Sequence, residues 1–330
     1  MKILVTGATG FLGSHVAEQL SAQGHQVRCL IRTSANRHFL ETLPNIEFCE
    51  GQLADEGALQ QAVTGIDAII HAAGLVKARH CSEFNTINVE GTINLLKATL
   101  AKAPQLKRFV LVSSLAAVGA ASDGHPLQED TIKSFNPVTH YGRSKLTAEQ
   151  QARTFADKIP ITIIRPPLIY GPRDKECLAF FQAVQYKIFP FFGSKHNTAS
   201  VIYGPDAANA LCQAVHTAAP SGAAYFIDDG IIHTSCDMIN QLAQAMGTKL
   251  WLKPVLPNGI LKAAAFITEQ YGKLSNSAVM LTRDKVNELI QPHWVCNSQK
   301  AQCELQWRPQ VDWATGVKLT YEWYQKAGWL

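Results

Sequence analysis

The stretch that decides the fold is Lys2-Ile3-Leu4-Val5-Thr6-Gly7-Ala8-Thr9-Gly10-Phe11-Leu12-Gly13. Its apolar start predicts a buried strand, and helix-type spacing follows from residue 12 to residue 23. The three glycines stand at GxxGxxG spacing, which allows a tight turn, close approach of a diphosphate and close packing of helix on strand. Backbone N–H groups at the start of such a helix hold phosphates. We therefore predict a dinucleotide site with contacts from Gly7, Thr9, Gly10, Phe11, Leu12 and Gly13.

Short apolar runs continue to alternate with helix-like segments up to about residue 165. We predict strands at 3–5, 26–31, 46–49, 68–71, 109–113 and 161–164, and helices at 12–23, 57–63, 85–102 and 141–157. Unbroken apolar runs are typical of strands that are buried on both faces of a parallel sheet. The pattern predicts an α/β protein with a doubly wound parallel sheet of the Rossmann type.

After Arg165 the regular alternation ends, and Pro166-Pro167 and Gly171-Pro172 interrupt the chain. We expect a dinucleotide-binding domain at 1–165 and a smaller, mainly substrate-binding lobe at 166–330. Some segments of the lobe are expected to return to the first domain, and a final helix is expected at about 313–326.

The composition argues against several classes of protein. A net charge of +4 without runs of like charge does not suit nucleic acid. No window approaches the roughly 20 apolar residues of a membrane span, and the apolar run Ile260–Ile267 predicts a buried or interfacial helix, with a peripheral membrane contact as the alternative. Eight scattered cysteines lack metal-type spacing and predict reduced thiols. With no signal peptide expected before the first strand, we predict a cytoplasmic protein.

The end of the second predicted strand carries Arg32 and no acidic residue. An NAD site usually has an acidic side chain here to hold the ribose 2′-hydroxyl, whereas a guanidinium suits a 2′-phosphate. NADP is therefore favoured over NAD. The alternatives are that Arg32 only stacks on adenine or is a solvated loop residue.

Small or polar residues also follow the next strands. His71-Ala72-Ala73-Gly74 would let a cofactor lie across the sheet edge. Asn88 lies inside a predicted helix, where asparagine is not favoured, so it either braces the backbone near a site or is a satisfied buried amide. Ser114, at the end of the fifth strand, could donate to a substrate carbonyl or be an ordinary turn serine.

Tyr141 and Lys145 stand four residues apart and share one face if the segment is helical. An ammonium beside a phenol favours the phenolate and lowers the tyrosine pKa from about 10. The pair could then donate and accept a proton in alcohol–carbonyl chemistry. Taken alone, such a pair is more often structural.

In this order the motifs resemble those of the extended short-chain dehydrogenases/reductases, within the NAD-dependent epimerase/dehydratase superfamily. Arg165-Pro166-Pro167, Ile169-Tyr170-Gly171-Pro172 and Glu304-Leu305-Gln306-Trp307-Arg308-Pro309 extend the resemblance over nearly the whole chain. It implies a Rossmann-type fold, a nicotinamide cofactor and a Ser–Tyr–Lys site with a supporting asparagine. The resemblance assigns oxyanion stabilisation to Ser114, acid/base work to Tyr141, pKa tuning and ribose binding to Lys145, and support to Asn88. It places further cofactor contacts at Gln52, Leu53, Ala72, Ala73, Gly74, Ser113, Pro166 and Leu168.

The chain departs from the family pattern in two places. Gln52 stands where the family usually has an aspartate that meets the adenine amino group, and a glutamine still offers an acceptor. Thr198-Ala199-Ser200 lacks the arginine that holds the substrate diphosphate in the nucleotide-sugar branch. Lys195 and His196 are the candidate replacements.

Apolar aromatic residues crowd the predicted lobe, and most of them fit a core, although some would suit a pocket for an uncharged ketone. They are Phe180, Phe181, Phe189, Phe191 and Phe192. The chain thus looks most similar to the branch of dihydroflavonol reductases and 3β-hydroxysteroid dehydrogenases.

We predict an NADP-preferring oxidoreductase that reduces a ketone or aldehyde, or oxidises the secondary alcohol, of a small and partly apolar substrate. The alternative is a nucleotide-sugar epimerase or dehydratase that keeps NAD(P) tightly bound. A third class is a nucleotide-sensing or scaffolding protein that keeps the fold and has lost the catalytic activity, and the intact Ser114, Tyr141 and Lys145 argue against it. Because family members are often homodimers, the resemblance implies pairing through the helices predicted at 85–102 and 141–157.

Overall fold

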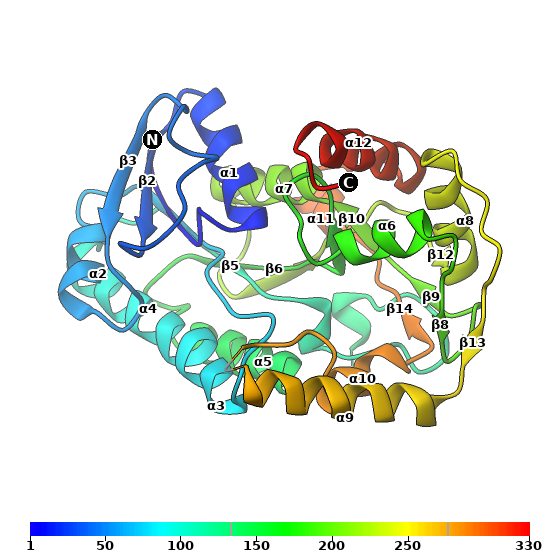
Figure 1. The fold of residues 1–330 in the computed structure, drawn as a ribbon. Coiled ribbons are helices and arrows are strands. Elements are labelled where there is room, and N and C mark those ends of the chain that lie inside the picture. Colours follow the sequence, from blue (N-terminus) through cyan, green and yellow to red (C-terminus); the bar gives the residue numbers. More distant parts are fainter. Residues whose placement is uncertain (133, 276) are drawn as a thin grey trace.

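The computed structural model describes residues 1–132, 134–275 and 277–330, and it is built around a seven-stranded sheet (Figure 1). All neighbouring strands are parallel, in the order β11-β6-β5-β4-β1-β2-β3. The predicted α/β fold class is confirmed. The strands are β1 (Lys2–Thr6), β2 (Gln26–Ile31), β3 (Ile46–Glu50), β4 (Ala68–His71), β5 (Arg108–Val112), β6 (Ile161–Arg165) and β11 (Ala223–Phe226).

Helices cover both faces of this sheet (Figure 1). Successive side chains of a strand point to opposite faces, so Ile3 and Val5 of β1 join one core while Leu4 joins the other. The first core is closed by α1 (Phe11–Ala22), α7 (Gly204–His216) and α11 (Gln299–Glu304). The second is closed by α2 (Glu56–Val63), α4 (Gly91–Lys102) and α5 (His140–Arg153).

The strand order reverses at the centre of the sheet, between β1 and β4. The chain runs from β1 outward to β2 and β3 and then returns to β4 on the other side. The carboxyl ends of β1 and β4 lie side by side, because Thr6 pairs with His71. In open parallel sheets this reversal point opens a crevice that binds ligands.

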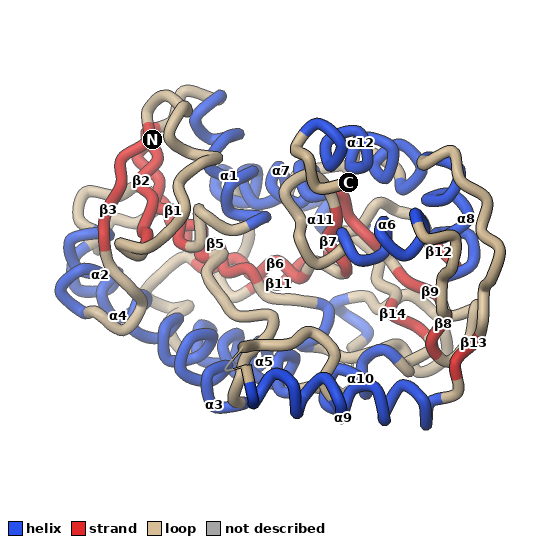
Figure 2. Tube along the Cα trace, viewed as in Figure 1, coloured by secondary structure: helices blue, strands red, loops and turns tan. Residues whose placement is uncertain are grey.

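The remaining elements form a smaller unit on one side of the sheet (Figure 2). They enclose a separate apolar core in which α12 (Trp313–Lys326) packs on α8 (Ser235–Ala245). The other elements are β7 (Leu168–Tyr170), β8 (Phe191–Phe192), β9 (Thr198–Ala199), β10 (Val201–Tyr203), β12 (His233–Thr234), β13 (Val255–Leu256), β14 (His293–Trp294), α6 (Leu178–Gln185), α9 (Asn258–Leu274) and α10 (Arg283–Leu289).

Several expectations can be compared directly with these bounds. The final helix at 313–326 is confirmed as α12. The helix expected at 85–102 consists of a π-helix, Asn85–Glu90, followed by α4, and α3 (Cys81–Phe84) precedes it. Short 3₁₀ turns lie at Leu115–Ala117 and Glu129–Thr131. After residue 165, α7 and β11 return to the main sheet, although the division into two domains stays a prediction.

The structure also bears on the cysteines and on the question of a membrane span. All eight cysteines are free. None of the helices in the described residues combines the length and apolar character that crossing a membrane requires.

Candidate active site

The glycine-rich turn between β1 and α1 forms a cradle of bare backbone. Gly7 has a φ of 74°, and a side-chain carbon on it would lie 2.7 Å from the backbone nitrogen of Ala73. A side-chain carbon on Gly13 would lie 2.1 Å from the Gly7 carbonyl oxygen. The Gly10 N–H donates to that same oxygen at 2.9 Å and closes the turn. Only glycine fits at these places, because any other residue would separate α1 from the ends of β1 and β4.

The start of α1 offers its N–H groups to an anion. No side chain caps this helix, and its first turn has no acidic residue. The first N–H groups of a helix lack partners within the helix and carry partial positive charge. A cradle of glycine backbone followed by an uncapped helix start fits the diphosphate of a nicotinamide dinucleotide.

Arg32 and Gln52, the predicted adenosine contacts, are exposed at the carboxyl ends of β2 and β3. In the described part of the chain, Arg32 makes no ion pair, whereas Arg37 pairs with Glu50 at 2.7 Å. The guanidinium of Arg32 is therefore available for a ligand. Leu53 is buried, and its carbonyl oxygen accepts from Asn94 at 3.1 Å.

Local packing brings Ser114 and Tyr141 together. The Ser114 hydroxyl accepts from the Ala116 N–H at 3.1 Å and so caps the 3₁₀ turn. Thr139 caps α5 by accepting from the Gly142 N–H at 3.1 Å. A side-chain carbon on Gly142 would lie 2.3 Å from the Ala116 carbonyl oxygen, so only glycine lets these two turns touch. This arrangement places the Ser114 side chain close enough to Tyr141 to influence its pKa.

Lys145 and Asn88 meet beside Gly74. The Lys145 ammonium is buried and donates to the Val112 carbonyl oxygen at 2.9 Å. A side-chain carbon on Gly74 would lie 3.1 Å from both the Lys145 Nζ and the Asn88 Oδ1. The bare backbone of Gly74 therefore leaves room for a ligand over the lysine.

Asn88 braces the segment that follows β4. Its Oδ1 accepts from the Leu75 N–H at 2.7 Å, and its Nδ2 donates to the Leu75 carbonyl at 3.1 Å and to the Ser144 hydroxyl at 2.9 Å. The residue lies inside the π-helix, a geometry often found at functional sites. Sequence spacing cannot reveal a π-helix, because the pattern is that of an ordinary helix.

Burial decides the pKa values of the two central groups. Burial raises the pKa of Tyr141 to about 12, while the nearby Ser114 side chain acts against this shift and the charge of Glu288 adds to it. Burial lowers the pKa of Lys145 to about 8, and the charge of Glu149 opposes that shift. The expected lowering of the tyrosine pKa by Lys145 is wrong for this structure, because desolvation of the phenol dominates.

Ser113 belongs to a buried charged cluster next to the site. Its hydroxyl donates to Glu149 at 2.5 Å, and Arg165 donates to both oxygens of that carboxylate at 2.9 and 2.7 Å. Since the hydroxyl of Ser113 is engaged here, a cofactor contact would use its backbone, and that contact stays a prediction. Pro166 follows the cluster and accepts from the Leu115 N–H at 2.9 Å, and Leu168 is exposed at the start of β7.

The side chain of His71 joins two parts of the site, although the sequence analysis gave it no role beyond its place in the His71–Gly74 segment. Its Nδ1 hydrogen-bonds the Thr6 hydroxyl at 2.6 Å, and its Nε2 hydrogen-bonds the Thr92 hydroxyl at 3.0 Å. Thr92 in turn donates to the Asn88 carbonyl at 2.7 Å. Burial, with a smaller contribution from the charge of Lys145, lowers the pKa of His71 to about 3, so the imidazole is neutral. It links the phosphate turn to the π-helix.

A cavity of about 360 Å³ adjoins Tyr141. Its walls come from the segment 76–84, which ends in α3, from the start of α5, and from residues within 269–273 and 277–288. Glu288 lines it with a buried Oε2 that has no hydrogen-bond partner among the described residues, while its Oε1 pairs with Lys285. The apolar wall residues are Val76, Ala78, Phe84, Val279 and Met280.

The five phenylalanines singled out in the sequence do not line this cavity. Phe181, Phe189 and Phe191 are buried in the core of the smaller unit, as most of the group was expected to be. The suggestion that some of them form the pocket wall is wrong for this cavity, because Phe181, Phe189 and Phe191 belong to the core where α6 packs on α8. Lys195 and His196 are exposed and also lie outside the lining.

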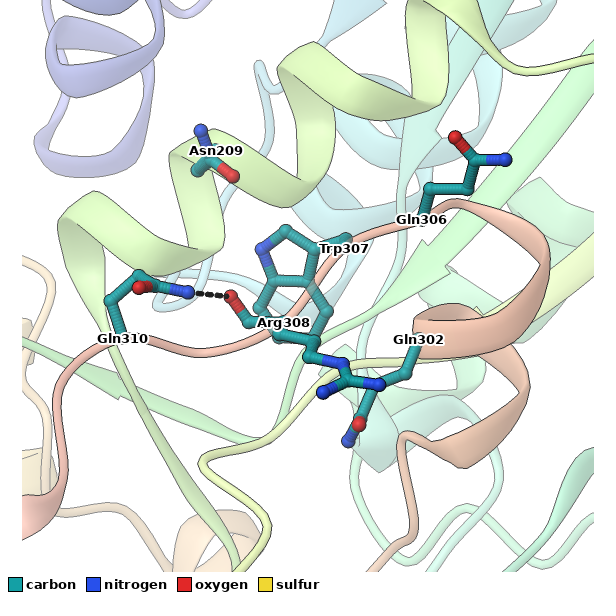
Figure 3. Close-up of a pocket in the computed structure, with 6 residues that line it drawn as sticks. All are labelled: Asn209, Gln302, Gln306, Trp307, Arg308 and Gln310. Carbon is teal, nitrogen blue, oxygen red and sulfur yellow. Dashed lines mark hydrogen bonds between the residues drawn. The ribbon is translucent and has the colours of Figure 1, made fainter.

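A second hollow, of about 460 Å³, lies away from all the predicted site residues. Figure 3 shows Asn209 on α7, Gln302 on α11 and Arg308 on the loop after α11 around it. Within it, Gln310 donates to the Arg308 carbonyl at 3.1 Å. Its walls carry amides and one guanidinium but no acid/base group of suitable pKa, so the cavity at Tyr141 is the better candidate.

Comparisons with known proteins agree with this geometry. A family model described as "NAD dependent epimerase/dehydratase family" matches residues 3–227. A ceramide reductase of Caulobacter vibrioides is 32% identical over 332 residues, which cover 99% of this chain and 96% of the relative. A 2-alkyl-3-oxoalkanoate reductase of Stenotrophomonas maltophilia is 28% identical over 331 residues, covering 96% and 98%.

Solved structures show the same fold. The crystal structure of gox2253 has a TM-score of 0.79 at 25% identity and covers 99% of this chain and 98% of its own. UDP-glucuronic acid 4-epimerase from Bacillus cereus, in complex with NAD, has a TM-score of 0.78 at 23% identity and 99% coverage of both chains.

Proposed function

Since the chain belongs to the NAD dependent epimerase/dehydratase family and is an NAD-dependent enzyme of the extended short-chain dehydrogenase/reductase type, we propose that it reduces the ketone of a partly apolar small molecule. The observation that carries the proposal is Tyr141, which lies beside Ser114 and lines a cavity of mixed polarity, where Val76, Phe84, Val279 and Met280 stand among charged and polar side chains. Two reductases that match over their full lengths, one named for ceramide and one for 2-alkyl-3-oxoalkanoates, support it.

Each residue of the site has a distinct task in this reaction. A nicotinamide dinucleotide, when bound, supplies the hydride. Tyr141 gives its proton to the carbonyl oxygen, and its pKa of about 12 keeps that proton in place until the oxygen gains charge. Ser114 donates a hydrogen bond to the developing oxyanion. Lys145 places a positive charge beside the site and would hold the ribose hydroxyls, while Asn88 braces the loop at Leu75.

The proposal also covers cofactor choice, location and assembly. The free guanidinium of Arg32 supports NADP over NAD. We further propose a cytoplasmic homodimer that pairs through α4 and α5.

The experiment that tests the function is a comparison of substrates. NADPH consumption with long-chain ketones is the expected result. Interconversion of UDP- or dTDP-sugars without net cofactor change would instead support the epimerase or dehydratase alternative.

Replacing Arg32 with aspartate is expected to reverse the cofactor preference. The carboxylate repels a 2′-phosphate and accepts from a 2′-hydroxyl, so kcat/KM should fall with NADPH and rise with NADH. Arg37→Gln is the matched control, because that arginine pairs with Glu50. Steady-state kinetics with both cofactors measure the change, and equal losses with the two would remove the 2′-phosphate argument.

The pH dependence of reduction is expected to follow Lys145. With a pKa of about 8, its ammonium loses the proton as pH rises, so kcat/KM should decline above about pH 8. Tyr141 stays protonated over the same range because its pKa is about 12. A pH–rate profile from about pH 6 to pH 10 checks this. A flat profile would show that the charge of Lys145 does not govern reduction.

A further inference from the structure

Helix α9 exposes an apolar face of its own. Leu274 is 87% exposed, Ile267 67% and Tyr271 66%, and Ile260 and Phe266 are also exposed. Another side of the helix buries Leu261 and Ala265 against α10. A surface helix normally presents a polar face to water. Helix α9 instead exposes large apolar side chains beside its polar residues, such as Lys262 and Lys273.

The segment that leads into α9 also exposes apolar side chains. Trp251 is 77% exposed and Tyr186 79%, and Leu252, Val255 and Ile188 are exposed beside them. Residues 186–188 lie beside residues 251–252. The Trp251 N–H donates to the Lys187 carbonyl at 2.9 Å, and Ile188 forms a parallel β-bridge with Leu252. Figure 1 shows α9 along one edge of the molecule with β13 running directly into its start. We call these residues, with the exposed side chains of α9, the apolar edge.

The exposed charges along the apolar edge are lysines. Exposed lysines accompany it at Lys187, Lys249, Lys253, Lys262 and Lys273. The only acidic residue between 249 and 274 is Glu269, whose side chain is 17% exposed and pairs with Arg283 at 2.8 Å. Apolar and aromatic side chains flanked by lysines characterise helices that lie in a membrane interface and bind anionic lipids. A two-fold contact between copies would bring the same lysines face to face, which disfavours a second copy as the occupant.

The apolar edge adjoins the candidate active site. Gly272 and Lys273 of α9, followed by Ser277, Val279 and Met280, line the same cavity as Tyr141. We propose that the apolar edge docks the protein on the surface of a membrane that contains anionic lipids, so that a ketone carried by a lipid enters the cavity from the bilayer. The choice of a lipid ketone rests on the proposed function, whereas the docking itself does not.

Vesicle binding of the full chain tests the docking without substrate or cofactor. The protein is expected to co-sediment with phosphatidylcholine vesicles that contain phosphatidylglycerol, and more weakly with phosphatidylcholine alone. Replacing Ile267 and Leu274 together with glutamine should weaken binding by about tenfold or more, since two large side chains no longer enter the interface. Leu319→Gln is the matched control, because Leu319 is an exposed leucine of α12 and should bind as the wild type does.

The lysines are tested separately. Lys253→Glu with Lys262→Glu should abolish the preference for phosphatidylglycerol, and neither residue lines the cavity. Absence of binding to both kinds of vesicle would overturn the proposal. So would a dimer, seen by sedimentation velocity, that the Ile267 and Leu274 replacements dissociate. Binding together with failure to reduce any ketone would overturn the proposed function and leave the docking intact.

Discussion

Tyr141→Phe is expected to lower the turnover of ketone reduction by about 10²–10⁴-fold. The change removes only the hydroxyl that gives its proton to the carbonyl oxygen, and Ser114 cannot replace it because a serine hydroxyl is a far weaker acid. The fold should persist, since the cap of α5 uses Thr139 and Gly142. Single-turnover and steady-state assays with NADPH measure the loss.

Cofactor affinity separates this result from damage to the site. Titration of NADPH against Tyr141→Phe should give nearly the affinity of the wild type, because the glycine cradle and Arg32 are unchanged. Tyr321→Phe, at a tyrosine of α12 outside the cavity lining, should leave turnover unaltered. Retention of wild-type turnover by Tyr141→Phe would remove this residue as the proton donor.

Glu149→Gln is expected to cost about 3–5 kcal/mol of folding stability. Glu149 is fully buried, and its carboxylate accepts two hydrogen bonds from Arg165, which is 2% exposed. The replacement leaves the guanidinium of Arg165 in the interior without a compensating charge. Urea unfolding at an unchanged m-value should show the loss as a shift in midpoint.

An exposed pair supplies the control. Glu47→Gln removes a carboxylate that pairs with Lys2 and Arg28 at the surface, and such pairs contribute about 0–1 kcal/mol. If Glu149→Gln lost no more folding stability than Glu47→Gln, the buried pair would not stabilise the fold.

Low pH should reduce the difference in folding stability between Glu149→Gln and the wild type. Burial acts to raise the pKa of Glu149, but the hydrogen bonds and charge of Arg165, with help from Ser113 and Arg153, outweigh it and lower the pKa. A carboxyl group with a lowered folded-state pKa stabilises the protein above its unfolded-state pKa. That contribution disappears as pH falls through the folded-state value. The two proteins should therefore converge in stability below about pH 4.

Much of the fold and part of the candidate site follow from short stretches of sequence. The turn at Gly7, Gly10 and Gly13 was predictable because its geometry depends on local backbone and on the absence of side chains. The strands were predictable because runs such as Ile3–Val5 are apolar throughout and must be buried on both faces. Tyr141 and Lys145 could be paired because a helix fixes the direction of residues four apart.

Tertiary structure decided what depends on residues far apart in the chain. The shift of the Tyr141 pKa follows from burial, which no spacing reveals, and so sequence reasoning gave the wrong direction. Glu149 finds Arg165 only when α5 packs beside β6. The walls of the cavity come from 269–288 rather than from the phenylalanines near 180–192, because β8 and α6 turn those rings into a core.

The apolar run Ile260–Ile267 also shows what sequence and tertiary structure each decide. By itself the sequence determined that this segment is helical and apolar, and left a buried helix and an interfacial one as alternatives. Only the packing of α9 on α10 decided which side chains are covered and which, such as Ile267, face outward. The physical reason is that periodicity fixes directions within one element, whereas burial depends on the partners that the rest of the chain brings to it.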